Sequence, residues 1–168
     1  IKRPHHEVTI ALVGKYTGLK ESYKSLTEAL VHGGIDSETR ANIQWVESDD
    51  IERRGPDRVL AGVDGIIVPG GFGNRGIEGK IQAIRHAREK QVPFLGLCLG
   101  MQCAVIEFAR NVSGMKRANT TEVDPASPYP VIHIMPEQEA IVRAKKFGGS
   151  MRLGAYPCVL AKATAARR

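Results

Sequence analysis

Residues 94–102 read Phe-Leu-Gly-Leu-Cys-Leu-Gly-Met-Gln, an apolar run that contains a Gly-x-Cys-x-Gly motif. The run is typical of a buried strand as far as Leu97, and residues 99–112 have the pattern of a long helix. A strand, a nucleophile and a helix in this order form a nucleophile elbow, whose sharp turn exposes one reactive side chain. The turn requires small residues two positions before and after the nucleophile, where Gly96 and Gly100 stand. The motif therefore predicts that Cys98 is a nucleophile.

The chemistry of this position supports the prediction. A thiolate at a helix N-terminus is stabilised by the helix dipole and by free backbone N–H groups. The N–H of Leu99 is expected to point to where an oxyanion forms. An isolated Gly-x-Cys-x-Gly also fits a small buried cysteine between packing glycines, but the preceding strand, the following helix and a second glycine loop favour the nucleophile. Cys103 and Cys158 lack these surroundings and are predicted to lie in the core.

The rest of the chain alternates between strand-like and helix-like segments. Strands are predicted at residues 8–13, 41–47, 65–68 and 93–97. Helices are predicted at residues 23–32, closed by Gly33-Gly34, and at residues 50–60, 77–90 and 99–112. This order predicts an α/β fold with a parallel sheet, right-handed crossovers and helices on both faces. Functional loops are then expected at the carboxyl ends of the strands.

The pattern changes after Gly114. Residues 119–130 are predicted to form a loop, and a turn is predicted at Gly148-Gly149. Shorter strands, with an antiparallel arrangement expected, are predicted at residues 131–135, 139–143 and 155–161.

A second glycine-rich loop follows the strand at residues 65–68. Its sequence, Gly71-Phe72-Gly73-Asn74-Arg75-Gly76, matches the dinucleotide-binding pattern G-x-G-x-x-G. That site also needs an acidic residue at the end of the next strand, and the next strand ends in Leu97-Cys98 instead. A better interpretation is that a backbone N–H of this loop is a second oxyanion donor, because glycine allows close approach. A turn that binds no ligand is the remaining alternative.

Length and composition exclude several classes of protein. The chain has 168 residues and a mass of 18.3 kDa, with 42% hydrophobic and 25% charged residues, as expected for one globular domain. Three cysteines with no CxxC pair argue against a disulfide framework or a structural zinc site. The net charge of +6 comes from scattered residues, and no nucleic-acid-binding motif is present. No stretch is long enough for a membrane span, and no secretion signal is visible. The cysteine usage is typical of buried thiols in a reducing compartment, so a cytoplasmic location is expected.

Several short blocks resemble the glutaminase domain of CTP synthase, a class I (triad) glutamine amidotransferase. The resemblance runs from about Val8 to about Leu160 and rests on Val13-Gly14-Lys15-Tyr16, Ser22-Tyr23-Lys24-Ser25, Pro69-Gly70-Gly71-Phe72-Gly73 with Arg75-Gly76, residues 96–102, Thr121-Glu122 and Met151-Arg152-Leu153-Gly154. It implies a flavodoxin-like open sheet, mostly parallel, with extra short strands in the C-terminal third. It also implies a single amidotransferase domain over residues 1–168.

The resemblance implies that the domain hydrolyses L-glutamine through a cysteine thioester. The ammonia would pass to an amidoligase domain that aminates UTP with ATP and Mg²⁺, in a tetrameric enzyme activated by GTP. No cofactor is implied for this domain itself. By position, Cys98 would be the nucleophile, Gly71 and Leu99 would form the oxyanion hole, and the glutamine pocket would be lined by Leu99, Gly100, Met101, Gln102, Glu122 and Arg152. The charges of Glu122 and Arg152 suit the amine and the carboxylate of glutamine.

Two features of the family are missing from the sequence. The N-terminal amidoligase domain with its phosphate loop is absent, and no His-x-Glu pair follows Met151-Arg152-Leu153-Gly154, so the chain is expected to be a truncated and weakly active fragment. Among the other histidines, His86 is predicted on a solvated helix face, and His133 is predicted as a packed core residue rather than a substitute base. The base and its orienting carboxylate stay unassigned. Two alternatives remain open: a glutamine-binding module without turnover, and a cysteine hydrolase that acts on γ-glutamyl substrates.

Overall fold

A computed structural model describes residues 4–15, 17–18, 20–71, 74–135, 157 and 159–164. The chain divides into two compact units, residues 1–133 and residues 134–168. The first unit contains all the helices and strands named below. Within the described residues, no helix has the length and apolar character needed to cross a membrane.

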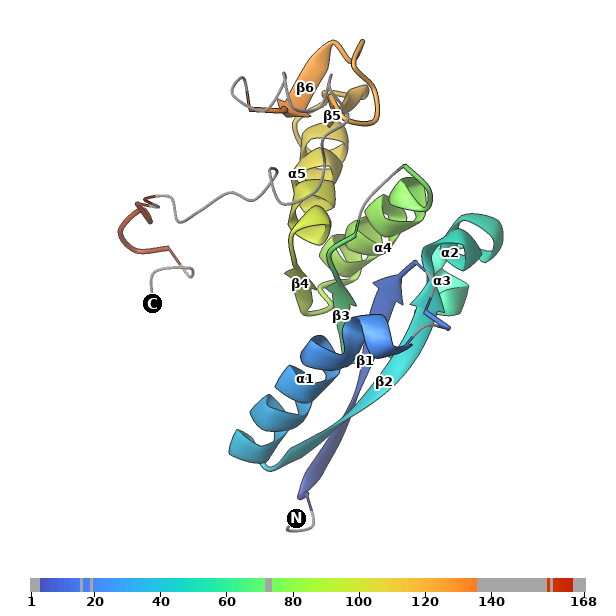
Figure 1. Cartoon of the computed structure of the whole chain (residues 1–168), viewed down its shortest axis with the longest axis vertical. Coiled ribbons are helices and arrows are strands. Elements are labelled where there is room, and N and C mark those ends of the chain that lie inside the picture. Colours follow the sequence, from blue (N-terminus) through green and yellow to red (C-terminus); the bar gives the residue numbers. More distant parts are fainter. Residues whose placement is uncertain are drawn as a thin grey trace. The chain divides into compact units, whose positions relative to one another are not determined.

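A four-stranded parallel sheet forms the centre of the first unit (Figure 1). Its strands are β1 (His6–Gly14), β2 (Thr39–Glu47), β3 (Gly65–Val68) and β4 (Phe94–Gly96). Their order across the sheet is β2-β1-β3-β4, and each neighbouring pair is parallel. The predicted parallel sheet is therefore confirmed. Strands β1 and β2 are longer than predicted because they pair along their whole lengths, from His6 opposite Thr39 to Gly14 opposite Glu47.

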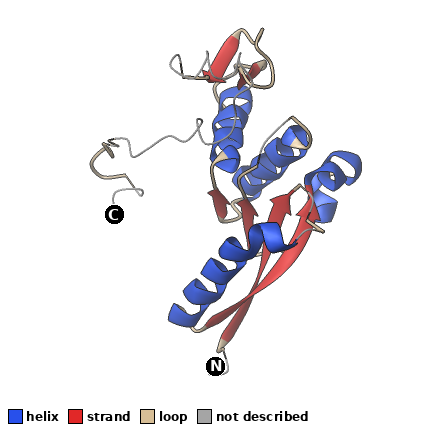
Figure 2. Cartoon of the chain, viewed as in Figure 1, coloured by secondary structure: helices blue, strands red, loops and turns tan. Residues whose placement is uncertain are grey.

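Helices alternate with these strands along the chain (Figure 2). They are the 3₁₀ helix η1 (Lys20–Tyr23) and the α-helices α1 (Lys24–Asp36), α2 (Ser48–Arg54), α3 (Pro56–Val59), α4 (Ile77–Lys90) and α5 (Leu99–Asn111). The single helix predicted at residues 50–60 is wrong. Gly55 adopts φ +80° and Pro56 begins a new helix, so the segment forms α2 and α3 instead.

Gly33 and Gly34 were predicted to end the first helix, and this is also wrong. Helix α1 continues through both glycines to Asp36, and its C-cap is Ser37. Gly34 has a packing role, because a Cβ at this position would overlap the carbonyl oxygen of Thr39 at the start of β2. The left-handed residue that follows the helix is Glu38, with φ +51°.

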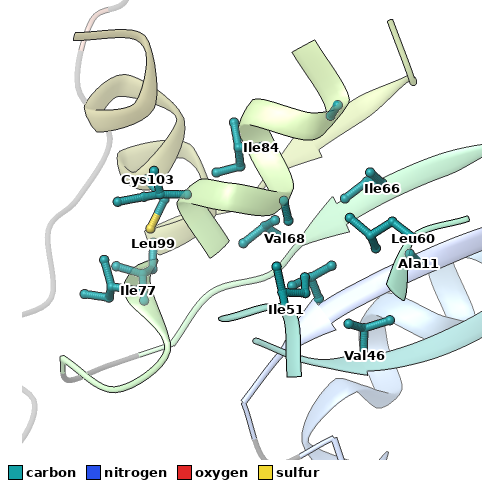
Figure 3. Close-up of a cluster of buried hydrophobic side chains, with 14 of the residues drawn as sticks. Ala11, Val46, Ile51, Leu60, Ile66, Val68, Ile77, Ile84, Leu99 and Cys103 are labelled. Carbon is teal, nitrogen blue, oxygen red and sulfur yellow. The ribbon is translucent and has the colours of Figure 1, made fainter. Parts of the chain in front are cut away.

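Buried side chains of β1 point alternately to the two faces of the sheet. Ala11 and Val13 of β1 belong to one buried cluster with residues of α4 and α5, whereas Leu12 between them points to the opposite face. Figure 3 shows this cluster, in which Ile66 and Val68 of β3 lie against Ile84 of α4. Helix α1 lies on the other side of the sheet, so helices cover both faces as predicted (Figure 1).

A second, two-stranded sheet follows α5. It pairs β5 (Ala118–Thr120), a strand that the sequence analysis does not predict, with β6 (Tyr129–Ile132), and the pair is parallel. An antiparallel arrangement of the predicted shorter strands stays a prediction, because residues 136–156 lie outside the described residues. The predicted loop at residues 119–130 is correct only for the connection between these strands. The strand predicted at residues 155–161 is absent from the part that is described, residues 157 and 159–161. The strand at residues 139–143 and the turn at Gly148-Gly149 lie outside the described residues.

Candidate active site

Cys98 lies at the sharp turn that the sequence predicts. It is the N-cap of α5, with φ +52° and ψ −109°, and its side chain is exposed. A non-glycine residue in such a conformation costs about 1–3 kcal/mol, and this kind of strain clusters at functional sites. The strain is held by packing on both sides, because Cβ atoms at Gly96 and Gly100 would collide with the backbone of Gly100 and of Val68 respectively.

The Gly70-Gly71 turn lies against this cysteine. A Cβ built on Gly70 would be 3.4 Å from Cβ of Cys98 and 3.9 Å from its Sγ. Leu99 is the first residue of α5, a position whose backbone N–H has no partner within the helix. The Cys98 thiol therefore lies beside two backbone segments, the Gly70-Gly71 turn and the start of α5 at Leu99, where N–H groups can stabilise a negative charge.

A hollow of about 380 Å³, which includes open solvent, connects these features. Its described lining residues are Gly71, Ile77, Cys98, Leu99, Gln102, Thr120, Glu122 and Val123. Residues that are distant in the sequence thus meet at one site. Five of the predicted site residues are among them: Gly71, Cys98, Leu99, Gln102 and Glu122.

The turn that carries Glu122 is stabilised by Thr120, the last residue of β5. The Oγ1 of Thr120 accepts a hydrogen bond from the N–H of Glu122 at 3.2 Å. The carbonyl oxygen of Thr120 accepts from Val123 at 3.1 Å and from Asp124 at 3.0 Å. Thr120 is 4% exposed, whereas Glu122 is exposed. The carboxylate is therefore held on a short, well-bonded turn and remains open to a soluble cation.

The remaining predicted pocket residues lie elsewhere or are not described. Gly100 is buried against β3, Met101 is 50% exposed, and neither belongs to the described lining. Arg152 lies outside the described residues. Sequence reasoning missed Ile77, Thr120 and Val123. Two signals pointed to them: Ile77 begins the helix after the glycine loop, and Thr120 and Val123 lie within two positions of Glu122.

Two expectations about histidines are wrong. The His86 side chain is only 9% exposed, and its Nδ1 lies 3.0 Å from Oδ1 of Asp57, so it does not lie on a solvated face. His133 follows the end of β6 and is exposed, so it is not a packed core residue. Neither residue is among the described residues that line the hollow.

Burial shifts the pKa values of two side chains near the site. Cys103 is fully buried, as predicted, and burial raises the pKa of its thiol to about 11. Figure 3 shows it in the cluster that also contains Ile77 and Leu99. Lys80 of α4 is 2% exposed, and burial lowers the pKa of its ammonium group. Its Nζ would lie 3.8 Å from a Cβ built on Gly71.

Comparison with known families agrees with this geometry. The model of the family described as glutamine amidotransferase class-I matches residues 19–165, most of the chain. The chain belongs to the class I glutamine amidotransferases. An exposed cysteine on a strained elbow beside a glycine turn is consistent with this membership.

This amidotransferase chain is similar to curated CTP synthases. It is 57% identical to one from Caldanaerobacter subterraneus subsp. tengcongensis over 98% of its own length, and 57% identical to one from Pyrococcus furiosus over 95%. It spans only 30% and 29% of those two proteins.

A solved structure from Trypanosoma brucei, described as the glutaminase domain of CTPS with bound acivicin, is also similar. It is 42% identical to this chain, with a TM-score of 0.72, and the match covers 78% of this chain and 51% of that one. The resemblance expected from the sequence is therefore confirmed, as is the fold class.

Proposed function

We propose that this chain is the glutaminase domain of a CTP synthase and that Cys98 is its nucleophile. The observation that carries the proposal is the exposed thiol of Cys98, held on a strained turn in one hollow with Gly71, Leu99 and Glu122. The similarity to CTP synthases and to a CTPS glutaminase domain supports the choice of glutamine as the substrate.

The proposed reaction begins when the Cys98 thiolate attacks the carboxamide carbon of glutamine, forming a C–S bond and a tetrahedral oxyanion. The backbone N–H groups at Gly71 and Leu99 stabilise that oxyanion. When it collapses, the C–N bond breaks, and the nitrogen takes up a proton and leaves as ammonia. Water then cleaves the thioester to glutamate and regenerates the thiol. The residue that transfers the protons stays unassigned.

Binding of glutamine is proposed to depend on two oppositely charged side chains. Glu122 is on its described lining and can pair with the α-ammonium group of glutamine. Arg152 is proposed to pair with the α-carboxylate. Such pairing would hold the side-chain amide over Cys98 and convert a bimolecular encounter into an oriented attack.

The rest of the reaction is proposed to take place outside this chain, because the chain spans about 30% of the length of the curated relatives that it matches. We propose that an amidoligase region of the same cytoplasmic, oligomeric enzyme takes the ammonia and uses ATP, UTP and Mg²⁺. GTP would act as an effector of the full enzyme.

The test is alkylation of this chain by a chloroketone analogue of glutamine, followed by peptide mass mapping. The expected result is modification of Cys98, with protection by free glutamine and no labelling in Cys98→Ser. Glu122→Gln should weaken protection by L-glutamine about tenfold, because one charge-assisted hydrogen bond is lost. Labelling confined to Cys103 or Cys158, or labelling that glutamine does not slow, would refute the assignment.

A further inference from the structure

Arg110 joins three elements that each carry part of the hollow. It lies in the last turn of α5, and its Nη1 is 2.9 Å from each carboxylate oxygen of Glu78 in the first turn of α4. Its Nε donates a hydrogen bond to the carbonyl oxygen of Ala118 in β5 at 2.7 Å. The Arg110 side chain is 17% exposed and that of Glu78 is 57% exposed, so the hydrogen bond to Ala118 is better protected from water than the ion pair.

Arg110 and each of its two partners lie on an element that also carries, or directly adjoins, residues that line the hollow. Glu78 follows Ile77, a lining residue, and α4 begins after the glycine loop that contains Gly71. Helix α5, which carries Arg110, begins next to Cys98. On the third side, Ala118 begins β5, whose last residue, Thr120, holds the turn of Glu122.

We propose that Arg110 is a positioning residue for glutamine recognition: it holds the Glu122 turn in place relative to Cys98 and the glycine loop. The inference rests on the proposed function, since it assigns Glu122 to the substrate amine. Arg110 is not among the described lining residues and does not contact the substrate. Arg110 acts through its planar guanidinium group, whose several N–H donors can bond a carboxylate and a backbone carbonyl at the same time.

A second arginine provides a matched control. Arg88 of α4 also spans α4 and α5, and its guanidinium pairs with Glu107, at 2.8 Å from Nη2 to Oε1. The Glu107 side chain is 2% exposed, so loss of Arg88 removes the partner of a buried carboxylate. Within the described part of the chain, Arg88 pairs with Glu107 and Glu89, neither of which belongs to β5 or to the Glu122 turn. Arg88→Met should therefore lower stability without changing glutamine recognition.

The experiment compares two alkylators of Cys98 in the 168-residue chain. One is the chloroketone analogue of glutamine, and the other is chloroacetamide, which reports thiol reactivity without recognition of the amino-acid end. Arg110→Met should lower the rate with the glutamine analogue about tenfold while chloroacetamide stays within about twofold, since a small displacement of a binding group is costly in rate. Arg110→Lys keeps the positive charge but loses the several donors of the guanidinium group. It should lower the alkylation rate with the glutamine analogue by less than Arg110→Met does.

A second measurement is independent of substrate. Amide hydrogen exchange at residues 120–124 should accelerate about tenfold or more in Arg110→Met and stay unchanged in Arg88→Met, because only the first variant releases β5 from α5. The proposal is overturned if Arg110→Met leaves both the exchange and the ratio of the two alkylation rates at wild-type values. It is also overturned if Arg88→Met lowers that ratio equally. A wild-type chain that shows no preference for the glutamine analogue refutes the proposed function instead, and the exchange result still decides the role of Arg110.

Discussion

Cys98 caps helix α5 and Cys103 lies inside the same helix, yet their surroundings differ in the properties that govern thiol reactivity. Cys98 is exposed and Cys103 is fully buried, with a pKa raised to about 11 by burial. At pH 8 roughly one Cys103 thiol in a thousand would be ionised even if a reagent reached it. We expect iodoacetamide to label Cys98 and to leave Cys103 unlabelled in the folded chain.

The measurement is peptide mass mapping after a short exposure at pH 8, with and without urea. Urea should allow labelling of both residues, because unfolding restores an ordinary pKa and access to the thiol. The variant Cys98→Ser is the control for labelling elsewhere. Rapid labelling of Cys103 in the folded chain would contradict the assignment of Cys103 to the core.

Lys80 is a buried cation whose location predicts a cost in stability. It is 2% exposed, and desolvation is the largest cause that lowers its pKa. We expect Lys80→Met to raise the free energy of unfolding by about 1 kcal/mol at pH 7, because an apolar chain of similar length replaces a buried charge. Urea unfolding checks this, with Lys90→Met on the exposed end of α4 as the control, for which about zero change is expected.

The pH dependence of this effect follows from the direction of the pKa shift. Below the lowered pKa of the folded state, Lys80 is charged in both states and the full cost of burying the charge is present. As the pH rises toward 10.5, the folded state loses its proton first, so the wild-type chain becomes relatively more stable. The advantage of Lys80→Met should therefore shrink above neutral pH. An advantage that grows with pH would contradict the assignment.

At the scale of elements, the packing of α5 against β3 depends on Gly100. A Cβ at this position would overlap the carbonyl oxygen of Val68, which is part of the backbone and cannot rotate away. We expect Gly100→Ala to destabilise the chain by about 3 kcal/mol, at the upper end of overpacking costs, and to slow alkylation of Cys98 by displacing the elbow.

Gly33→Ala is the matched control for this variant. Gly33 lies inside helix α1, and a Cβ there would have nothing within 4 Å. The substitution should raise the free energy of unfolding by about 0.5–1 kcal/mol, because alanine loses less backbone entropy in a helix than glycine does. Equal effects of the two substitutions in thermal unfolding would show that α5 can move away from β3 at no cost.

The same glycines show how far sequence reasoning extends at this scale. Gly96 and Gly100 were predicted correctly because a nucleophile elbow imposes a local requirement on its own neighbours. Gly33 and Gly34 were misread as a helix stop because Gly34 serves a contact with Thr39, which the local pattern does not contain. The helix break at Gly55-Pro56 was missed because two short helices share one polar pattern.

In the candidate site too, residues set by local patterns could be predicted from the sequence, and residues set by long-range contacts could not. Cys98, Gly71 and Leu99 could be found because parallel strands bring their carboxyl ends to one edge of the sheet. Glu122 came only from the family resemblance, since its place in the hollow depends on β5 packing beside α5. Arg110 could not be found from spacing, because its partner Glu78 is 32 positions away in the sequence.

At the scale of the whole first unit, stability is distributed unevenly over the two faces of the sheet. Strand β1 is central, and Ala11, Leu12 and Val13 are fully buried. Helix α1 contributes no buried residue to the structure, and its Val31 and Ile35 are 52% and 58% exposed. Helix α5 on the opposite face buries Cys103 and Ile106 almost completely. Helix α1 should therefore open at a lower free energy than the sheet and α5.

We expect native-state hydrogen exchange to separate these regions. Amides of β1 and of the middle of α5 should exchange only through global unfolding, whereas those of α1 should exchange at least about thirtyfold faster, which corresponds to about 2 kcal/mol. Low concentrations of urea should accelerate exchange in β1 much more than in α1, since local opening of a poorly buried helix exposes little surface. If the α1 amides instead exchanged at the β1 rate with the same urea dependence, α1 would belong to the cooperative core, and its exposed apolar side chains would contribute little to its stability.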